Sequence, residues 1–304
     1  GQRYQAVFLA TGAQRSRRLG IEGEELPGVV PAVDWLRQVN LQPKSAEVGR
    51  QVIVVGGGNA AIDAARCALR LGAEEVTVLY RRSRAEMPAL AEEVRAAEEE
   101  GVVVRPFVAP LRLSNDGGAP FLLCRTMAPG DFGADGRRQP VPIAGSEFTL
   151  AADLVLAAVG QQADLHCLGA ELAPLCSSGG SLSVDAHGRT ALPWLFAGGD
   201  LASGPGTAIG AIASGQRAAL AIHRYLRPED WSLPSWLVQR PVPVPFDPLA
   251  EPSTRRRAQP SELDPAQRRR SFAEVEGPLP AEVALQEALR CLRCEYREGD
   301  GCHD

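Results

Sequence analysis

Lysine is almost absent from this chain. Only Lys44 among the 32 basic residues is a lysine, and the residue four positions before it is an asparagine rather than a tyrosine. A Schiff-base enzyme would have one candidate lysine here, and a tyrosine–lysine dehydrogenase pair would lack its tyrosine. The sequence therefore disfavours both of these chemistries.

Long apolar runs and aromatic-rich basic stretches are missing as well. No run of about 18 apolar residues is present, so we expect no membrane span, and the first residues show no signal-peptide pattern. The net charge is −5, and no basic stretch carries interleaved aromatics, so nucleic acid is not an expected partner. Three of the seven cysteines lie at the tail and the others are scattered. This pattern favours a reducing cytoplasm over a disulfide framework.

What the sequence does contain is an alternation of strand-like and helix-like segments, which predicts an α/β fold. The pattern at residues 111–150 changes to short strands with Gly, Asn and Asp turns, which predicts an antiparallel meander. Residues 227–280 are rich in proline and arginine and indicate an extended arm. The expected strands are residues 4–10, 51–55, 75–80, 102–106, 153–159 and 194–197, and the expected helices are residues 32–40, 60–71, 89–100, 207–226 and 281–292.

One glycine motif lies directly between an expected strand and an expected helix. Residues 56–61 (GGGNAA) fit the pattern G-x-G-x-x-A. Gly56 permits a tight turn, Gly58 lets the backbone approach a pyrophosphate, and Ala61 lets the helix pack close to the strand. The helix N-terminus offers unpaired N–H groups to phosphates. In this context the motif predicts a dinucleotide site, and a purely structural glycine turn is the alternative.

Two arginines indicate which dinucleotide binds. An NAD site usually has an acidic residue about 20 residues past the glycines, which binds the ribose 2′-hydroxyl. Here the second strand runs into Arg81 and Arg82, with Arg84 just beyond and no carboxylate before Glu86. Guanidinium groups can hold a 2′-phosphate through two parallel hydrogen bonds. The pair favours NADPH, and a solvated arginine pair at a strand end is the alternative.

A second motif joins glycine to an acid near residue 200. Gly199 and Asp200 lie between a strand and a helix rich in Gly and Ala. A carboxylate there can accept hydrogen bonds from ribitol or ribose hydroxyls, and the helix start at residues 207–209 can direct its amides at an electron-rich ring edge. An ordinary turn with a helix cap would have the same sequence, so both interpretations stay open.

Together these segments resemble the small subunit of bacterial glutamate synthase and its relatives, within the thioredoxin-reductase-like flavoproteins that bind two dinucleotides. The resemblance runs along the whole chain and rests on AVFLATGA, VIVVGGGNAAIDAAR, VTVLYRRSRAEMPA, DLVLAAVG, LFAGGDLASGPGTAIGAIASGQRAA and EALRCLRC. In this family a Rossmann-like NADPH domain is inserted into an FAD domain. The resemblance implies FAD-domain segments at residues 1–45 and 161–227, an NADPH-binding domain at residues 46–160, an arm at residues 228–280 and a cysteine-containing tail at residues 281–304.

The resemblance also implies the cofactor contacts. For NADPH they are Gly56, Gly58, Asn59, Ala60, Arg81 and Arg82. For FAD they are Gly199, Asp200, Thr207, Ala208 and Ile209, and Gly160 at the end of DLVLAAVG completes the expected cofactor-binding residues.

Two departures from the family qualify this picture. The first glycine fingerprint, which holds the FAD pyrophosphate, would lie before Tyr4 and is not in this sequence. We therefore expect the FAD site to be incomplete without an N-terminal segment or a partner chain that carries the fingerprint. No C-x-x-C lies within residues 46–160, which excludes a thioredoxin-reductase disulfide mechanism.

The tail is a candidate metal site. Cys291 and Cys294 form a C-x-x-C, and Cys302 follows eight residues later. A [4Fe–4S] cluster normally takes four cysteines, so a fourth ligand would come from elsewhere. Zinc with His303 and free thiols are the alternatives. The resemblance implies a cluster segment after EALRCLRC, which favours iron–sulfur.

The sequence therefore predicts the NADPH-binding part of a flavin-dependent oxidoreductase, which passes hydride to FAD and electrons on to iron–sulfur centres of a partner. No catalytic side chain is expected, because the cofactors carry this chemistry. The alternative is a nucleotide-binding and partner-docking module without its own flavin.

Overall fold

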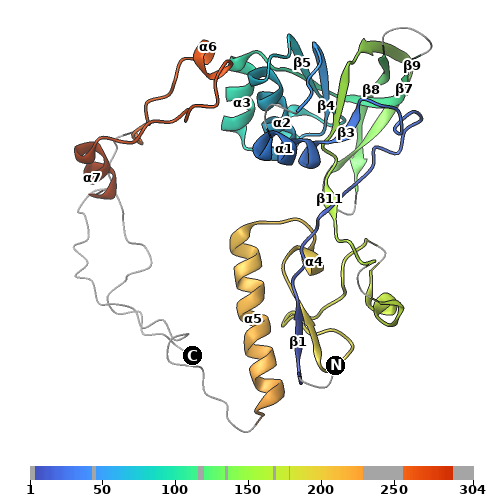
Figure 1. Cartoon of the computed structure of the whole chain (residues 1–304), viewed down its shortest axis with the longest axis vertical. Coiled ribbons are helices and arrows are strands. Elements are labelled where there is room, and N and C mark those ends of the chain that lie inside the picture. Colours follow the sequence, from blue (N-terminus) through green and yellow to red (C-terminus); the bar gives the residue numbers. More distant parts are fainter. Residues whose placement is uncertain are drawn as a thin grey trace. The chain divides into compact units, whose positions relative to one another are not determined.

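The computed structural model describes residues 4–42, 46–115, 120–133, 136–166, 169–177, 179–228 and 256–289. It divides into two compact units, residues 1–231 with 269–271 and residues 232–268 with 272–304 (Figure 1). None of the described helices is long and apolar enough to cross a membrane.

A five-stranded parallel sheet forms the core of what we call the sheet domain, residues 29–157. The strand order is β3-β10-β4-β5-β6, and every neighbouring pair is parallel. Residues in the interior strands β4 and β10 are almost all buried, as expected where a parallel sheet is covered on both faces. The strands are β3 (Val29–Pro31), β4 (Gln51–Val55), β5 (Glu75–Tyr80), β6 (Val103–Pro106) and β10 (Leu154–Ala157).

Alternate side chains of the sheet enter two different hydrophobic cores, because successive residues of a strand point to opposite faces. Val52 and Val54 pack with the three helices α1 (Ala32–Leu41), α2 (Asn59–Arg70) and α3 (Ala91–Glu100). Ile53 and Val55 pack instead with a three-stranded antiparallel meander. The meander consists of β7 (Val108–Ser114), β8 (Phe121–Phe132) and β9 (Arg138–Ala151). The predicted α/β fold is confirmed, with helices on one face of the sheet and the meander on the other (Figure 1).

The sheet domain begins earlier than the sequence indicated. β3 pairs with β10 in the register Val29↔Val155, and Trp35 of α1 is buried in the helical core. The expected boundary at residue 46 therefore falls after two elements of this domain. Strand pairing with β10, more than 120 residues away, decides the position of β3, and a pattern local to residues 13–45 does not report it.

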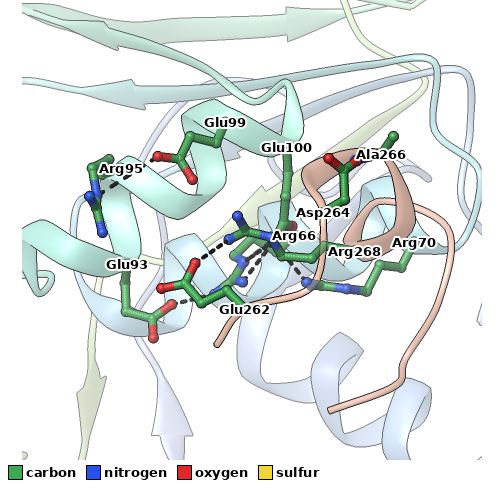
Figure 2. A network of polar contacts seen from close by, with 10 residues as sticks. All are labelled: Arg66, Arg70, Glu93, Arg95, Glu99, Glu100, Glu262, Asp264, Ala266 and Arg268. Carbon is green, nitrogen blue, oxygen red and sulfur yellow. Dashed lines mark hydrogen bonds and ion pairs between the residues drawn. The ribbon is translucent and has the colours of Figure 1, made fainter. Parts of the chain in front are cut away.

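A cluster of buried charges joins α2 to α3. Arg66 and Arg70 lie one turn apart on α2, and each donates to the Glu100 carboxylate at the end of α3, at 2.7 Å and 3.0 Å. The Glu100 side chain is fully buried, and Arg66 also pairs with Glu93. Figure 2 shows both guanidinium groups directed at this carboxylate. We call Arg66, Arg70 and Glu100 the buried triad.

The remaining elements of the first unit form a split domain, residues 4–12 and 163–228. β1 (Val7–Leu9) pairs in parallel with β12 (Leu195–Ala197), although 185 residues lie between them. A separate hydrophobic core contains residues from both segments. The chain passes between the two domains at β2 (Arg15–Ser16) and β11 (Gln161–Gln162), which pair antiparallel. The helices of the split domain are η3 (Ala170–Leu175), α4 (Asp200–Ser203) and α5 (Ala208–Leu226).

The described part of the arm and tail is not uniformly extended. Residues 256–289 contain α6 (Pro265–Arg268) and α7 (Ala281–Leu289), and Glu262 and Glu276 form an isolated antiparallel bridge. The helix expected at residues 281–292 thus exists at least as far as residue 289.

Candidate functional site

The glycine turn after β4 combines two crowded positions with an open one. A Cβ on Gly56, whose φ is +149°, would lie 2.3 Å from the carbonyl oxygen of Ala158. A Cβ on Gly57 would lie 2.5 Å from the ring of Tyr80. A Cβ on Gly58 would meet nothing within 4 Å, and the φ there is an ordinary −91°. The fold therefore requires glycine at 56 and 57, and it leaves the space in front of Gly58 empty of protein.

The N-terminus of α2 opens at this turn without a side-chain cap. Gly58 is the N-cap residue, and it has no side chain that could accept a hydrogen bond from the first turn. The Asn59 side chain bonds elsewhere, because its Oδ1 accepts the Leu90 N–H at 3.0 Å. The Ala61 N–H donates to the Gly58 carbonyl at 2.9 Å, whereas the N–H groups before it, at the very start of the helix, have no acceptor within the helix. This end of α2 therefore presents free donors and a positive dipole end to an anion.

The predicted arginine pair is divided by the structure. Arg81 is exposed at the end of β5, whereas Arg82 is 7% exposed and its Nε donates to the Arg138 carbonyl at 2.8 Å. Arg84 pairs with Glu98. Arg81 is thus the member of the pair whose charge faces solvent.

The loop after the arginines is tied back to the glycine turn. The Ala89 N–H donates to the Gly57 carbonyl at 3.0 Å, and the Tyr80 hydroxyl donates to the Glu86 carbonyl at 2.9 Å. Ser83 donates to the Glu86 carboxylate through both its hydroxyl and its N–H, and this bonding lowers the pKa of Glu86. The structure therefore brings residues 56–60 and residues 81–89, which we call the arginine loop, together at the carboxyl ends of β4 and β5.

The second predicted site forms around the start of α4 and α5. Gly199 has φ +61° and donates its N–H to Ser214 Oγ at 3.0 Å. Asp200 Oδ1 accepts the Gly206 N–H at 3.1 Å, and Thr207 caps α5 by accepting the Gly210 N–H at 3.1 Å. A cavity of 240 Å³ lies here, and it is lined by Phe8, Ala10, Gly12, Gly198, Gly199, Asp200, Gly206, Thr207, Ala208 and Ala211.

Two further glycines have a positive φ, one at the cavity and one where the chain passes between the two domains. Gly12, φ +75°, lines the cavity beside Asp200, although the sequence did not single it out. The signal was present, because Gly12 ends the LATG motif after a strand that pairs with β12. Gly160, φ +102°, for which the sequence predicts a cofactor contact, lies at the β2–β11 crossing, where its carbonyl accepts the Arg17 N–H at 2.9 Å.

Two of the cysteines that the structure describes, Cys67 and Cys124, are unsuited to thiol chemistry. Cys67, Cys124 and Cys176 are free thiols. Burial raises the pKa of Cys67, and it raises that of Cys124 to about 12, so neither thiol ionises readily at neutral pH. The predicted metal ligands Cys291, Cys294 and Cys302 lie outside the described residues.

Solved structures share this fold. FprA of Mycobacterium tuberculosis in complex with NADPH superposes with a TM-score of 0.61 at 22% identity, over 77% of this chain and 67% of that one. Thioredoxin reductase of Lactococcus lactis gives a TM-score of 0.52 at 22% identity, over 73% and 66% of the two chains.

Similar sequences cover nearly the whole chain. The β subunit of NADP(+)-dependent formate dehydrogenase of Moorella thermoacetica is 43% identical, over 97% of this chain and 43% of its own length. The β subunit of NADPH-Fe(3+) oxidoreductase of Geobacter sulfurreducens is 38% identical, over 97% and 49%. The chain thus spans less than half the length of either relative.

The resemblance to glutamate synthase is confirmed at the level of sequence. The small chain of glutamate synthase [NADPH] of Escherichia coli is 34% identical, over 73% of this chain and 51% of its own length. The model of the pyridine nucleotide-disulphide oxidoreductase family matches residues 2–215, which contain both the glycine turn and the cavity beside Asp200. The chain belongs to the pyridine nucleotide-disulphide oxidoreductase family.

Proposed function

We propose that this chain is the NADPH-binding part of a flavin-dependent oxidoreductase, which transfers hydride from NADPH to FAD and passes electrons to iron–sulfur centres of a partner. One observation carries the proposal: an open glycine turn, an uncapped helix N-terminus and an exposed arginine meet at one edge of a parallel sheet. Two relatives support an NADP(H)-dependent role within a larger assembly, because they are named as β subunits of an NADP(+)-dependent formate dehydrogenase and of an NADPH-Fe(3+) oxidoreductase.

The residues at the glycine turn would bind and orient the dinucleotide. The space in front of Gly58 and the first N–H groups of α2 suit a pyrophosphate, and Arg81 suits the 2′-phosphate. The bound cofactors supply the hydride chemistry, and the protein supplies position and electrostatics.

The cavity beside Asp200 would hold part of the flavin nucleotide. Asp200 uses Oδ1 for the Gly206 N–H, which fixes the orientation of the carboxylate. The exposed first turn of α5 presents the amides of Ala208 and Ile209 toward solvent or a ligand. Together with a segment or partner chain that carries the first glycine fingerprint, this chain should show visible flavin absorption after incubation with FAD, and NADPH should bleach it. No flavin absorption in that mixture would favour a docking module without its own flavin.

Arg81→Ala is expected to weaken NADPH binding by roughly tenfold or more and to leave NADH binding nearly unchanged. Loss of a charge-assisted hydrogen-bond pair costs about 1.5–3 kcal/mol, and each 1.4 kcal/mol is about tenfold in affinity. NADH has no 2′-phosphate to lose this contact. Calorimetric titration of both nucleotides measures the two affinities.

Arg84→Ala is the matched control for that experiment. It removes the same charge from the same loop, but Arg84 is already paired with Glu98, so NADPH affinity should change little. Equal affinity of the wild-type chain for NADH and NADPH would contradict the proposed donor.

For the tail we propose an iron–sulfur site that includes Cys291, Cys294 and Cys302. Anaerobic reconstitution with iron and sulfide is expected to give broad visible absorption, which Cys291→Ser and Cys294→Ser abolish. Cys176→Ser is the control, because this half-buried thiol belongs to the split domain. A chain that takes up zinc in place of iron, or neither metal, would contradict the iron–sulfur assignment.

A further inference from the structure

We infer that the two neighbouring arginines have different roles in nucleotide selection. Arg81 contacts the 2′-phosphate. Arg82 and Glu86 position Arg81, because they hold the backbone of Arg138 at the start of β9. The inference rests on the proposed binding of NADPH. If the inference is correct, contacts from the antiparallel meander contribute to the preference for NADPH over NADH.

Arg82 is engaged with the protein on two sides. Its Nε donates to the Arg138 carbonyl at 2.8 Å, and its own carbonyl accepts the Phe107 N–H at 3.1 Å. The residue is 7% exposed and makes a further interaction within the protein. A guanidinium that left this place to meet a ligand would give up this hydrogen bond, and a side chain that is now buried would have to move. Arg82 therefore supports the structure next to the ligand site, and its guanidinium is not available to bind the ligand.

Glu86 lies near the same residue. The backbone of Arg138 lies close enough to the Glu86 carboxylate to contribute to its lowered pKa, after the two hydrogen bonds that the carboxylate accepts from Ser83. Arg82 thus binds the carbonyl of Arg138, and Glu86, four residues further along the arginine loop, lies beside the same part of the backbone. We call these contacts the Arg138 clamp.

A strained corner next to the clamp fixes the meander further. Phe107, between β6 and β7, has φ +57°, the one positive value among the non-glycine residues that the structure describes. Its N–H donates to the Arg82 carbonyl, and its carbonyl accepts the Met127 N–H of β8 at 2.7 Å. Such a backbone conformation persists where its surroundings over-determine it. Arg82 is therefore bonded directly to Phe107, between β6 and β7, and to Arg138 of β9, and it is connected to β8 through Phe107. These contacts fix the residue next to Arg81.

Two explanations of the role of Glu86 predict opposite changes in NADPH affinity when its charge is removed. Glu86 is an anion beside the expected position of an anionic phosphate. If it acted through charge alone, Glu86→Gln would strengthen NADPH binding. If it positions Arg81, Glu86→Gln loosens the loop and weakens NADPH binding.

We expect Glu86→Gln to weaken NADPH binding about threefold to tenfold, as measured by calorimetry on the full chain, with a smaller change for NADH. Hydrogen exchange at the amides of Phe107 and Arg138 should become faster. Glu98→Gln is the matched control, because it removes a carboxylate that pairs with Arg84 in the same loop, and NADPH affinity should stay equal or rise. Arg82→Lys keeps the charge and loses the Nε donor, so it should follow Glu86→Gln in both measurements.

Two results would overturn the inference. One is Glu86→Gln binding NADPH as tightly as the wild type or more tightly. The other is Arg82→Lys retaining the full preference for NADPH, as expected of a cation that touches the phosphate. Failure of the proposed function has a different signature, since the wild type itself would then bind NADH and NADPH alike.

Discussion

Glu100→Gln is expected to lower the free energy of unfolding by about 3–5 kcal/mol, the range found when one partner of a buried ion pair is removed. The substitution leaves the side-chain volume nearly unchanged and takes away the only carboxylate of the buried triad. Arg66 would keep its pair with Glu93, but Arg66 and Arg70 would lie one turn apart as two largely buried cations without the carboxylate that both of them bind. Urea unfolding followed by circular dichroism measures the loss.

The size of this effect follows from where Glu100 lies. Its side chain is fully buried, and those of Arg66 and Arg70 are 12% and 9% exposed. The attraction is therefore little screened by water, and an unpaired charge at this depth is costly. Glu100 also occupies the last position of α3, where the helix dipole disfavours an anion, so the two arginines provide its compensation.

Glu99→Gln provides the control for this prediction. It changes the preceding residue of the same helix in the same way, but Glu99 is 39% exposed and lies 3.9 Å from Arg95. Exposed pairs of this kind contribute about 0.2–1 kcal/mol. A loss for Glu100→Gln no larger than that for Glu99→Gln would show that the buried triad does not hold α2 to α3.

The parts of the fold that the sequence predicted correctly are those with a local signal. β4, α2 and β5 have the expected bounds to within a residue, because an apolar strand, a glycine turn and an alanine-rich helix each leave a periodic pattern. β3 left no such pattern. It has three residues, and it becomes a strand because its backbone finds β10 as a partner.

In the candidate site too, the features with a local sequence pattern were predicted and those that depend on distant residues were not. The glycine turn was predicted because its function depends on backbone shape over six residues. The different surroundings of Arg81 and Arg82 were not predicted, because the burial of Arg82 depends on Arg138, which lies 56 positions further along. Residue types alone suggested two equivalent cations, whereas the meander covers one of them and leaves the other exposed.

Substitutions in the glycine turn should separate the needs of the fold from those of the ligand. Gly56→Ala is expected to damage both. Its Cβ would lie 2.3 Å from the Ala158 carbonyl oxygen, and φ +149° is unfavourable for alanine, so strain of about 1–3 kcal/mol follows. The end of β4 would have to move relative to β10, and the turn would lose its shape.

Gly58→Ala is expected to damage binding alone. The Cβ meets no protein atom within 4 Å and the φ of −91° suits alanine, so stability should be kept or should rise by about 0.4–1 kcal/mol, because alanine has fewer unfolded conformations to lose. The added methyl group would occupy the space in which we place the pyrophosphate. Forcing atoms into such a space costs about 1–3 kcal/mol, so the affinities for NADPH and NADH should both fall by roughly fivefold to more than a hundredfold. Thermal unfolding and calorimetric titration of the same samples measure the two effects. If Gly58→Ala binds both nucleotides as the wild type does, the pyrophosphate does not lie against this turn, and the site proposed here is wrong.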